Sequence, residues 1–224
     1  MKTDFLRFKK SDLKMNLMFL LALMLVNCSK DDNSEKPPED TRLALPATLE
    51  NNTPLPIPDA TNLTGACGSN ATPGSAENSI EITADGIIAN PSKVSIEVDI
   101  SHTFGSDVVL ELFTPSGDSV GLIKRIGAAN NTVCGTDADF IAGNKLVFNS
   151  ANTTLLAAPF VSGNYAPTSG MGTFPTTVMM TPLATFLTGK NIKGVWRMKM
   201  YDCGVDDTGK LNSWKLKFDT GALQ

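Results

Sequence analysis

Hydrophobic and polar residues alternate with a period of two along most of the chain after residue 53. The clearest run is 94–101, where valine and isoleucine occupy every second position between serine, glutamate and aspartate. The same alternation recurs at 80–83, 110–112, 196–201 and 214–218. A period of two places successive side chains on opposite faces of a strand, so these segments predict half-buried β-strands.

Turn-forming residues separate these strands. Combinations of glycine, proline, aspartate and serine occur at 84–86, 90–92, 115–118 and 207–209, and such residues favour tight turns. No segment after residue 53 has the apolar stripe of a long helix, although 183–187 is expected to form one short turn, and no internal repeat is present. Short strands joined by turns predict an all-β sandwich.

The N-terminus has the pattern of a bacterial lipoprotein signal. A basic segment precedes an apolar run of twelve residues at 15–26, which is too short to span a hydrocarbon core of ~30 Å as a helix. The run ends at Asn27-Cys28, followed by Ser29-Lys30-Asp31-Asp32, which resembles a lipobox with an acidic export tag. We therefore expect residues 1–27 to be removed and Cys28 to be acylated. An ordinary signal peptide with a chance cysteine, or a buried helix, is the alternative.

Residues 28–53 are expected to form a disordered tether, because Lys36-Pro37-Pro38-Glu39-Asp40 favours no helix and offers little to bury. Leu43, Leu45 and Leu49 are its apolar points. The sandwich is expected to occupy residues 54–224.

The net charge of the chain argues against nucleic acid as a partner. The whole chain has a net charge of −4, and removing the five basic and two acidic residues of 1–27 leaves 14 basic and 21 acidic residues, or −7. An acidic protein is not expected to bind nucleic acid.

Five short motifs carry a family resemblance. In order they are Ile57-Pro58-Asp59, Ile100-Ser-His102-Thr103, Pro115-Ser116-Gly117, Gly194-Val-Trp196 and Asp207-Thr-Gly209-Lys-Leu211-Asn-Ser213-Trp214. Together they resemble the P domain of proprotein convertases, which follows a subtilisin-like protease domain, and the resemblance covers roughly residues 55–220. It implies a jelly-roll-like sandwich, which we expect to have about eight strands.

Catalytic residues of the convertase type are not evident in the sequence. Such catalysis needs a serine, a base and an orienting acid, but His102 is the chain's one histidine and matches a structural position of the family. The chain also has no Gly-x-Ser-x-Gly elbow and no Cys or His spacing typical of zinc. We expect a non-catalytic protein in which His102, Trp196 and Trp214 are structural.

Three cysteines other than Cys28 are available for disulfides: Cys67, Cys134 and Cys203. Export places them in an oxidising setting where disulfides persist. In the resembled family the loops of Cys134 and Cys203 lie toward the same end, which favours a bridge between these two. Cys67 is the alternative partner for either, and three free thiols are the other alternative.

Six aspartates are candidate calcium ligands. Calcium binds six to eight oxygens from carboxylates and loop carbonyls, and some P-domain relatives bind calcium near these positions. The same residues are also good turn formers, which needs no metal. The candidates are Asp107, Asp137, Asp139, Asp202, Asp206 and Asp207.

Two functions are compatible with these features. The first is an outer-membrane lipoprotein, exposed at the cell surface, whose sandwich binds a protein or glycan ligand. The second is an accessory module that stabilises or presents a separate subtilisin-like protease. A purely structural envelope component is a third, weaker hypothesis. No organic cofactor is expected.

Overall fold

The computed structural model describes residues 40–61, 72–172 and 174–224. The expected signal peptide and Cys28 lie outside these residues. Within them, no helix has both the length and the apolar character needed to cross a membrane.

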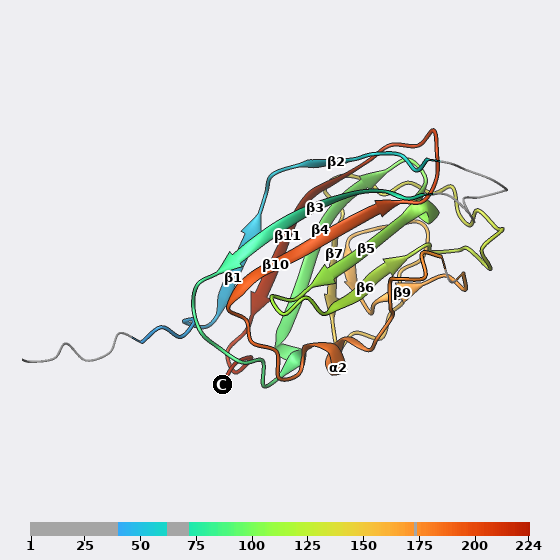
Figure 1. Cartoon of the computed structure of the whole chain (residues 1–224). Coiled ribbons are helices and arrows are strands. Elements are labelled where there is room, and N and C mark those ends of the chain that lie inside the picture. The colour runs from blue at the N-terminus through green and yellow to red at the C-terminus, as the bar shows by residue number, and fades with distance from the viewer. Residues whose placement is uncertain (1–39, 62–71, 173) are drawn as a thin grey trace, which may run out of the picture. The chain divides into compact units, whose positions relative to one another are not determined.

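Two β-sheets form a sandwich (Figure 1), which confirms the predicted all-β fold. One sheet has the order β1-β11-β4-β7-β8, with β2 also paired to β11, and the other has the order β3-β10-β5-β6-β9. Pairing is antiparallel except for β7 with β8 and β6 with β9. The strand bounds are β1 Ala47–Asn51, β2 Leu55–Ile57, β3 Gly74–Ile82, β4 Val94–His102, β5 Val108–Phe113, β6 Ser119–Lys124, β7 Lys145–Asn149, β8 Gly163–Tyr165, β9 Thr168–Ser169, β10 Gly194–Asp202 and β11 Gly209–Phe218.

Helical structure is confined to short segments in the described residues. These are the α-helix α2 at Leu183–Leu187 and two 3₁₀ turns, η2 at Pro91–Lys93 and η3 at Gly105–Asp107. The short turn expected at 183–187 is therefore present.

The core lies between the sheets and follows the alternation seen in the sequence. In β4 the four apolar residues are buried, and Trp214, Leu216 and Phe218 of β11 pack with them from the neighbouring strand. Trp196 of β10 is fully buried on the opposite sheet, and its indole N–H donates to the Ile192 carbonyl at 2.8 Å. Burying a large apolar side chain contributes roughly 1.5–3 kcal/mol, so these strand faces supply much of the stability.

The N-terminal boundary of the sandwich differs from the prediction. Residues 47–51 form β1, which pairs with β11, and the compact unit begins at Thr41. Leu43, Leu45 and Leu49 pack against the core. The expectation of an unpacked tether to residue 53 is therefore wrong for residues 41–53. Three leucines at short spacing have enough apolar surface to dock on an existing sheet, even without a strong strand pattern.

The chain enters the sandwich at one end, which we call the entry end and define by residues 41–43, the turn 84–86 and the C-terminus. Leu43 N–H donates to the Asp85 carbonyl at 3.1 Å, and Gln224 N–H donates to the Ile87 carbonyl at 3.0 Å. β4 and β10 both run from the entry end to the opposite end, where they finish at His102 and Asp202. We call this opposite end the loop end, and Figure 1 shows the β10–β11 connection there.

Candidate functional site at the loop end

His102, the last residue of β4, is the centre of a buried charged cluster. Its Nε2 lies 3.1 Å from Oδ2 of Asp202, and neither side chain is exposed. The backbone N–H of Phe104 donates to Nδ1 at 3.1 Å, which places the ring proton on Nε2, facing the carboxylate. Burial opposes charge on the ring, but the Asp202 carboxylate outweighs it and raises the pKa of His102. Both ring nitrogens are engaged, so His102 has no free nitrogen for a substrate or a metal.

Asp202, at the end of β10, and Asp107, directly before β5, lie where these two paired strands meet at the loop end. Oδ1 of Asp202 accepts the Gly204 N–H at 2.9 Å, and the Cys203 N–H donates to the Asp107 carbonyl at 2.9 Å. Burial, followed by repulsion from Asp202, raises the pKa of Asp107 to about 6, although the Arg125 guanidinium opposes this. Arg125 is itself buried, and its Nε donates to the Ser106 carbonyl at 3.2 Å.

Two glycines make room for the cluster, Gly204 in the β10–β11 connection and Gly209 at the start of β11. A β-carbon at Gly209 would overlap the His102 ring, and one at Gly204 would overlap the Asp107 carboxylate. The Asp207-Thr-Gly209 motif therefore has a packing explanation, because only glycine lets the backbone approach these side chains so closely. Gly209 also pairs with His102 in the ladder between β11 and β4.

The predicted bridge between Cys134 and Cys203 is wrong. Cys203 is a free, fully buried thiol, and burial raises its pKa to about 12. It follows Asp202 directly and packs with Val109 and Val178 in a small apolar cluster. Cys134 is exposed and disulfide-bonded, so its partner is outside the described residues.

The six candidate calcium ligands are spread over the loop end. Asp107 and Asp202 are buried, whereas Asp137, Asp139 and Asp206 are exposed. The sixth, Asp207, is partly buried and accepts a hydrogen bond from Thr103 Oγ1 at 2.8 Å. In the part of the chain that the structure describes, no three His, Cys, Asp or Glu side chains come together in a group that could hold a metal ion. Calcium binding stays a prediction.

A groove of about 300 Å³ lies beside the cluster, on the outer surface of the first sheet. It is formed by three short segments, 101–103, 139–142 and 208–210. The segment 139–142 is held against β4 by two backbone hydrogen bonds between His102 and Phe140, at 3.0 and 2.9 Å. Phe140 stacks on Phe160 with ring centroids 4.0 Å apart. The groove therefore has a rigid wall.

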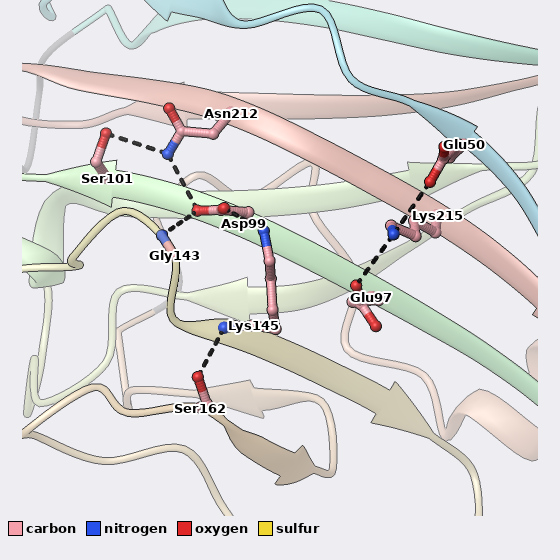
Figure 2. Close-up of polar contacts among 9 residues, drawn as sticks. All are labelled: Glu50, Glu97, Asp99, Ser101, Gly143, Lys145, Ser162, Asn212 and Lys215. Carbon is pink, nitrogen blue, oxygen red and sulfur yellow. Dashed lines mark hydrogen bonds and ion pairs between the residues drawn. The ribbon is translucent and has the colours of Figure 1, made fainter.

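A polar network continues from the groove along the outer face of the same sheet (Figure 2), and the sequence patterns did not single it out. Lys215 of β11 bridges Glu50 of β1 at 3.0 Å and Glu97 of β4 at 3.7 Å. Nearer the groove, Asp99 is largely buried and accepts hydrogen bonds from the Gly143 N–H at 3.0 Å, the Asn212 amide at 3.1 Å and the Lys145 ammonium. Burial alone would raise the pKa of Asp99, but these donors outweigh it and lower the pKa.

The register of β11 explains why this network was missed. A β-bulge between Leu211 and Ser213 adds Asn212 at the point where β11 passes Asp99. Strict alternation treats Asp99 as an ordinary solvent-facing residue, and bulges are difficult to recognise from one sequence.

Glu111 and Lys124, on the outer face of the second sheet, were missed for a related reason. Glu111 is buried and accepts a 2.7 Å hydrogen bond from the Tyr201 hydroxyl, while Lys124 Nζ donates to the Val178 carbonyl at 2.9 Å. Burial lowers the pKa of Lys124. The segment around Val178 lies along β6, where the Gly121 N–H donates to the Met179 carbonyl at 2.8 Å. This loop buries side chains that alternation places in solvent.

The chain is a β-sandwich module with a buried charged cluster at its loop end. Comparison with known families shows which β-sandwich family it is similar to. Residues 164–218 match the family model of the proprotein convertase P-domain. The matched segment runs from β8 through β10 and β11, and it confirms the resemblance inferred from the motifs.

Among characterised proteins, the chain is similar to leupeptin-inactivating enzyme 1 of Streptomyces exfoliatus, with 24% identity over 172 residues. The aligned part is 76% of this chain and 28% of that enzyme, so the chain spans little more than a quarter of the relative it matches.

Among solved structures, the chain is similar to the serine protease of Aeromonas sobria, determined alone and in a complex with the chaperone. The identity is 15%, the coverage is 79% of this chain and 28% of that one, and the TM-score is 0.33 in both cases. A score this low does not establish a shared fold.

Proposed function

We propose that this protein is a non-catalytic, membrane-anchored module that binds a separate protein through the loop end of its sandwich, and that this partner is a protease. The match of residues 164–218 to the proprotein convertase P-domain carries the proposal. The similarity to part of a leupeptin-inactivating enzyme agrees with it. A likeness of fold alone would not carry a function.

The His102 geometry supports a binding role over a hydrolytic one. A general base must have a nitrogen or oxygen free to take a proton from the reacting group. The one histidine of the chain has Nδ1 occupied by a backbone N–H and Nε2 by Asp202, in a cluster without solvent exposure. Its role is to join the ends of β4 and β10, one from each sheet.

The position of the groove in the sandwich supports display of the loop end. We propose that Cys28 is acylated and places the protein in the outer membrane, at the cell surface. The first packed residues, 41–43, contact the turn at Asp85, and the groove lies at the opposite end of β4. A module tethered in this way presents its loop end to a partner.

Co-purification tests the proposal. The full chain, carrying an affinity tag at its C-terminus, is extracted from membranes in mild detergent, with calcium and with chelator in parallel. We expect an endogenous protease to be recovered, and its activity or half-life to change when the gene of this protein is removed. Recovery of a soluble glycan or a non-protease protein in its place would favour the general ligand-binding role. The absence of any specific partner would contradict both roles.

A further inference from the structure

We infer that the groove at the loop end binds an extended segment of a partner protein in which a basic side chain and an apolar side chain lie on the same side. The inference rests on the proposed function, because it names the surface with which the accessory module engages its partner. Three observations carry it: an exposed apolar rim, an excess of acidic side chains and a wall held by the core.

The apolar rim is formed by residues that follow the stacked phenylalanines. Phe140 and Phe160 form a parallel bridge, so the residues that follow them, Ile141 and Val161, lie next to each other. Ile141 is 54% exposed and Val161 is 50% exposed. Single exposed apolar residues are common on protein surfaces, but here two lie next to each other and one of them, Ile141, lines the groove.

The charge of the loop end is strongly one-sided. Among the described residues at the loop end, the exposed acidic side chains are Asp59, Asp137, Asp139 and Asp206, and the exposed base is Lys210 of β11, which lines the groove together with Asp139. Arg125 is also present but is buried beside Asp107. A surface with this charge attracts basic partners and repels acidic ones, which affects partner choice and association rate more than affinity.

The wall of the groove formed by residues 139–142 brings an acidic and an apolar side chain together. Asp139 and Ile141 are both exposed and flank the buried Phe140, and alternate residues of an extended segment share a face. This wall therefore offers one carboxylate and one apolar side chain, two residues apart, while Lys210 lines the groove from β11. An extended partner segment with arginine or lysine two residues from leucine or a similar residue matches this arrangement. The wall needs no rearrangement to bind, because backbone hydrogen bonds fix Phe140 to His102.

A defined peptide tests the inference with the full chain in detergent. The probe is a labelled ten-residue peptide built from Arg-Ser-Leu-Ser repeats, and two control peptides replace every arginine with glutamate or every leucine with serine. Fluorescence anisotropy gives the dissociation constants at low and physiological salt. We expect the arginine–leucine peptide to bind, and both control peptides to bind at least about tenfold more weakly, since both kinds of contact contribute.

Variants then localise the site. Asp139→Asn removes one exposed charge and is expected to weaken binding about two- to fivefold, as for a surface ion pair. Ile141→Ser removes apolar contact area and is expected to weaken it about tenfold. Asp219→Asn, an exposed acid outside the groove segments, is the matched control and should bind like wild type. Thermal melts of all variants check that the fold is retained.

Three results would overturn the inference. They are no detectable binding of the arginine–leucine peptide, equal binding of all three peptides, or unchanged binding in both groove variants. If the full chain carrying both Asp139→Asn and Ile141→Ser recovers the same amount of protease as wild type, the groove is not the contact surface, while the accessory role stands. If wild type recovers no partner, the accessory role itself fails.

Discussion

At the scale of single residues, the loop-end cluster concentrates charged side chains that are almost fully buried. Asp107 is the clearest example among the acids, because burial and the Asp202 carboxylate both disfavour its ionised form and raise its pKa to about 6. In the unfolded chain an aspartate titrates near pH 3.9. The folded protein therefore binds more protons than the unfolded chain between these values, and stability falls as the pH rises through that window.

We predict that Asp107→Asn removes this pH dependence. A difference of about two pKa units corresponds to an upper bound of roughly 3 kcal/mol. The variant should gain stability relative to wild type as the pH rises from about 4 to about 6, because asparagine does not ionise. Urea unfolding at several pH values measures the difference. Asp219→Asn, at an exposed position directly after β11, serves as the control. A constant difference between Asp107→Asn and wild type across this range would contradict the prediction.

The cysteines give a second prediction at this scale. Cys203 is fully buried with a raised pKa, and a protonated, inaccessible thiol reacts slowly. We expect iodoacetamide to modify Cys203 only after unfolding. In protein oxidised during export, peptide mapping should find Cys134 linked to Cys67, the alternative that the sequence left open. A Cys134–Cys203 peptide, or fast labelling of Cys203 in the folded protein, would contradict this.

At the scale of elements, β1 is a strand that the hydrophobic pattern of the sequence did not predict. Leu49 of β1 packs against the core, while Glu50 pairs with Lys215 on the outer face. We predict that a chain beginning at residue 54 is less stable than one beginning at residue 41 by roughly 2–4 kcal/mol, from the loss of three leucines that contact the core. Chemical denaturation of both measures the loss. Within the full chain, Leu49→Ala should destabilise and Thr48→Ala, on the exposed side of β1, should not. Equal stability of the two truncated chains would show that β1 contributes little.

Calcium binding by the loops is a further prediction at this scale. The described aspartates do not form a group that could hold a cation, so binding requires the exposed loop residues Asp137, Asp139 and Asp206 to come together around the ion. A ligand that binds only the native state must stabilise it. We expect a higher melting midpoint in calcium than in chelator, with a smaller effect of magnesium. An unchanged midpoint at millimolar calcium would contradict calcium binding, and the acidic residues would then be explained as turn formers.

At the scale of the whole molecule, alternation was sufficient to predict the sandwich and its core. The period of two in β4, β10 and β11 is a direct consequence of one buried and one solvent-facing side, and the structure has those faces. The buried polar residues were harder to predict. Asp99 depends on a bulge in another strand, and Glu111 depends on a loop that covers its sheet. Such long-range effects leave no local pattern in the sequence.

The position of the groove could not be predicted for the same reason. Its three segments are separated by more than thirty residues along the chain, and only the sheet topology brings them together. The motif predicts a structural role for His102, but its pairing with Asp202 joins residues 100 positions apart. The fold class thus follows from local pattern, whereas the site follows from which strands become neighbours.

The last prediction concerns the attachment of the whole molecule to a membrane. Buried methylene groups of a lipid anchor contribute about 0.8 kcal/mol each, and a single acyl chain gives only reversible binding, so stable anchoring needs more than one chain. We expect the wild-type protein to fractionate with the outer membrane and to partition into detergent. Cys28→Ala should move it to the soluble fraction with an unchanged melting midpoint, because the compact unit begins at Thr41. A tag inserted at the loop end should be accessible to antibody on intact cells. Membrane retention of Cys28→Ala would contradict lipid anchoring, and an inaccessible loop-end tag on an anchored wild-type protein would contradict surface display alone.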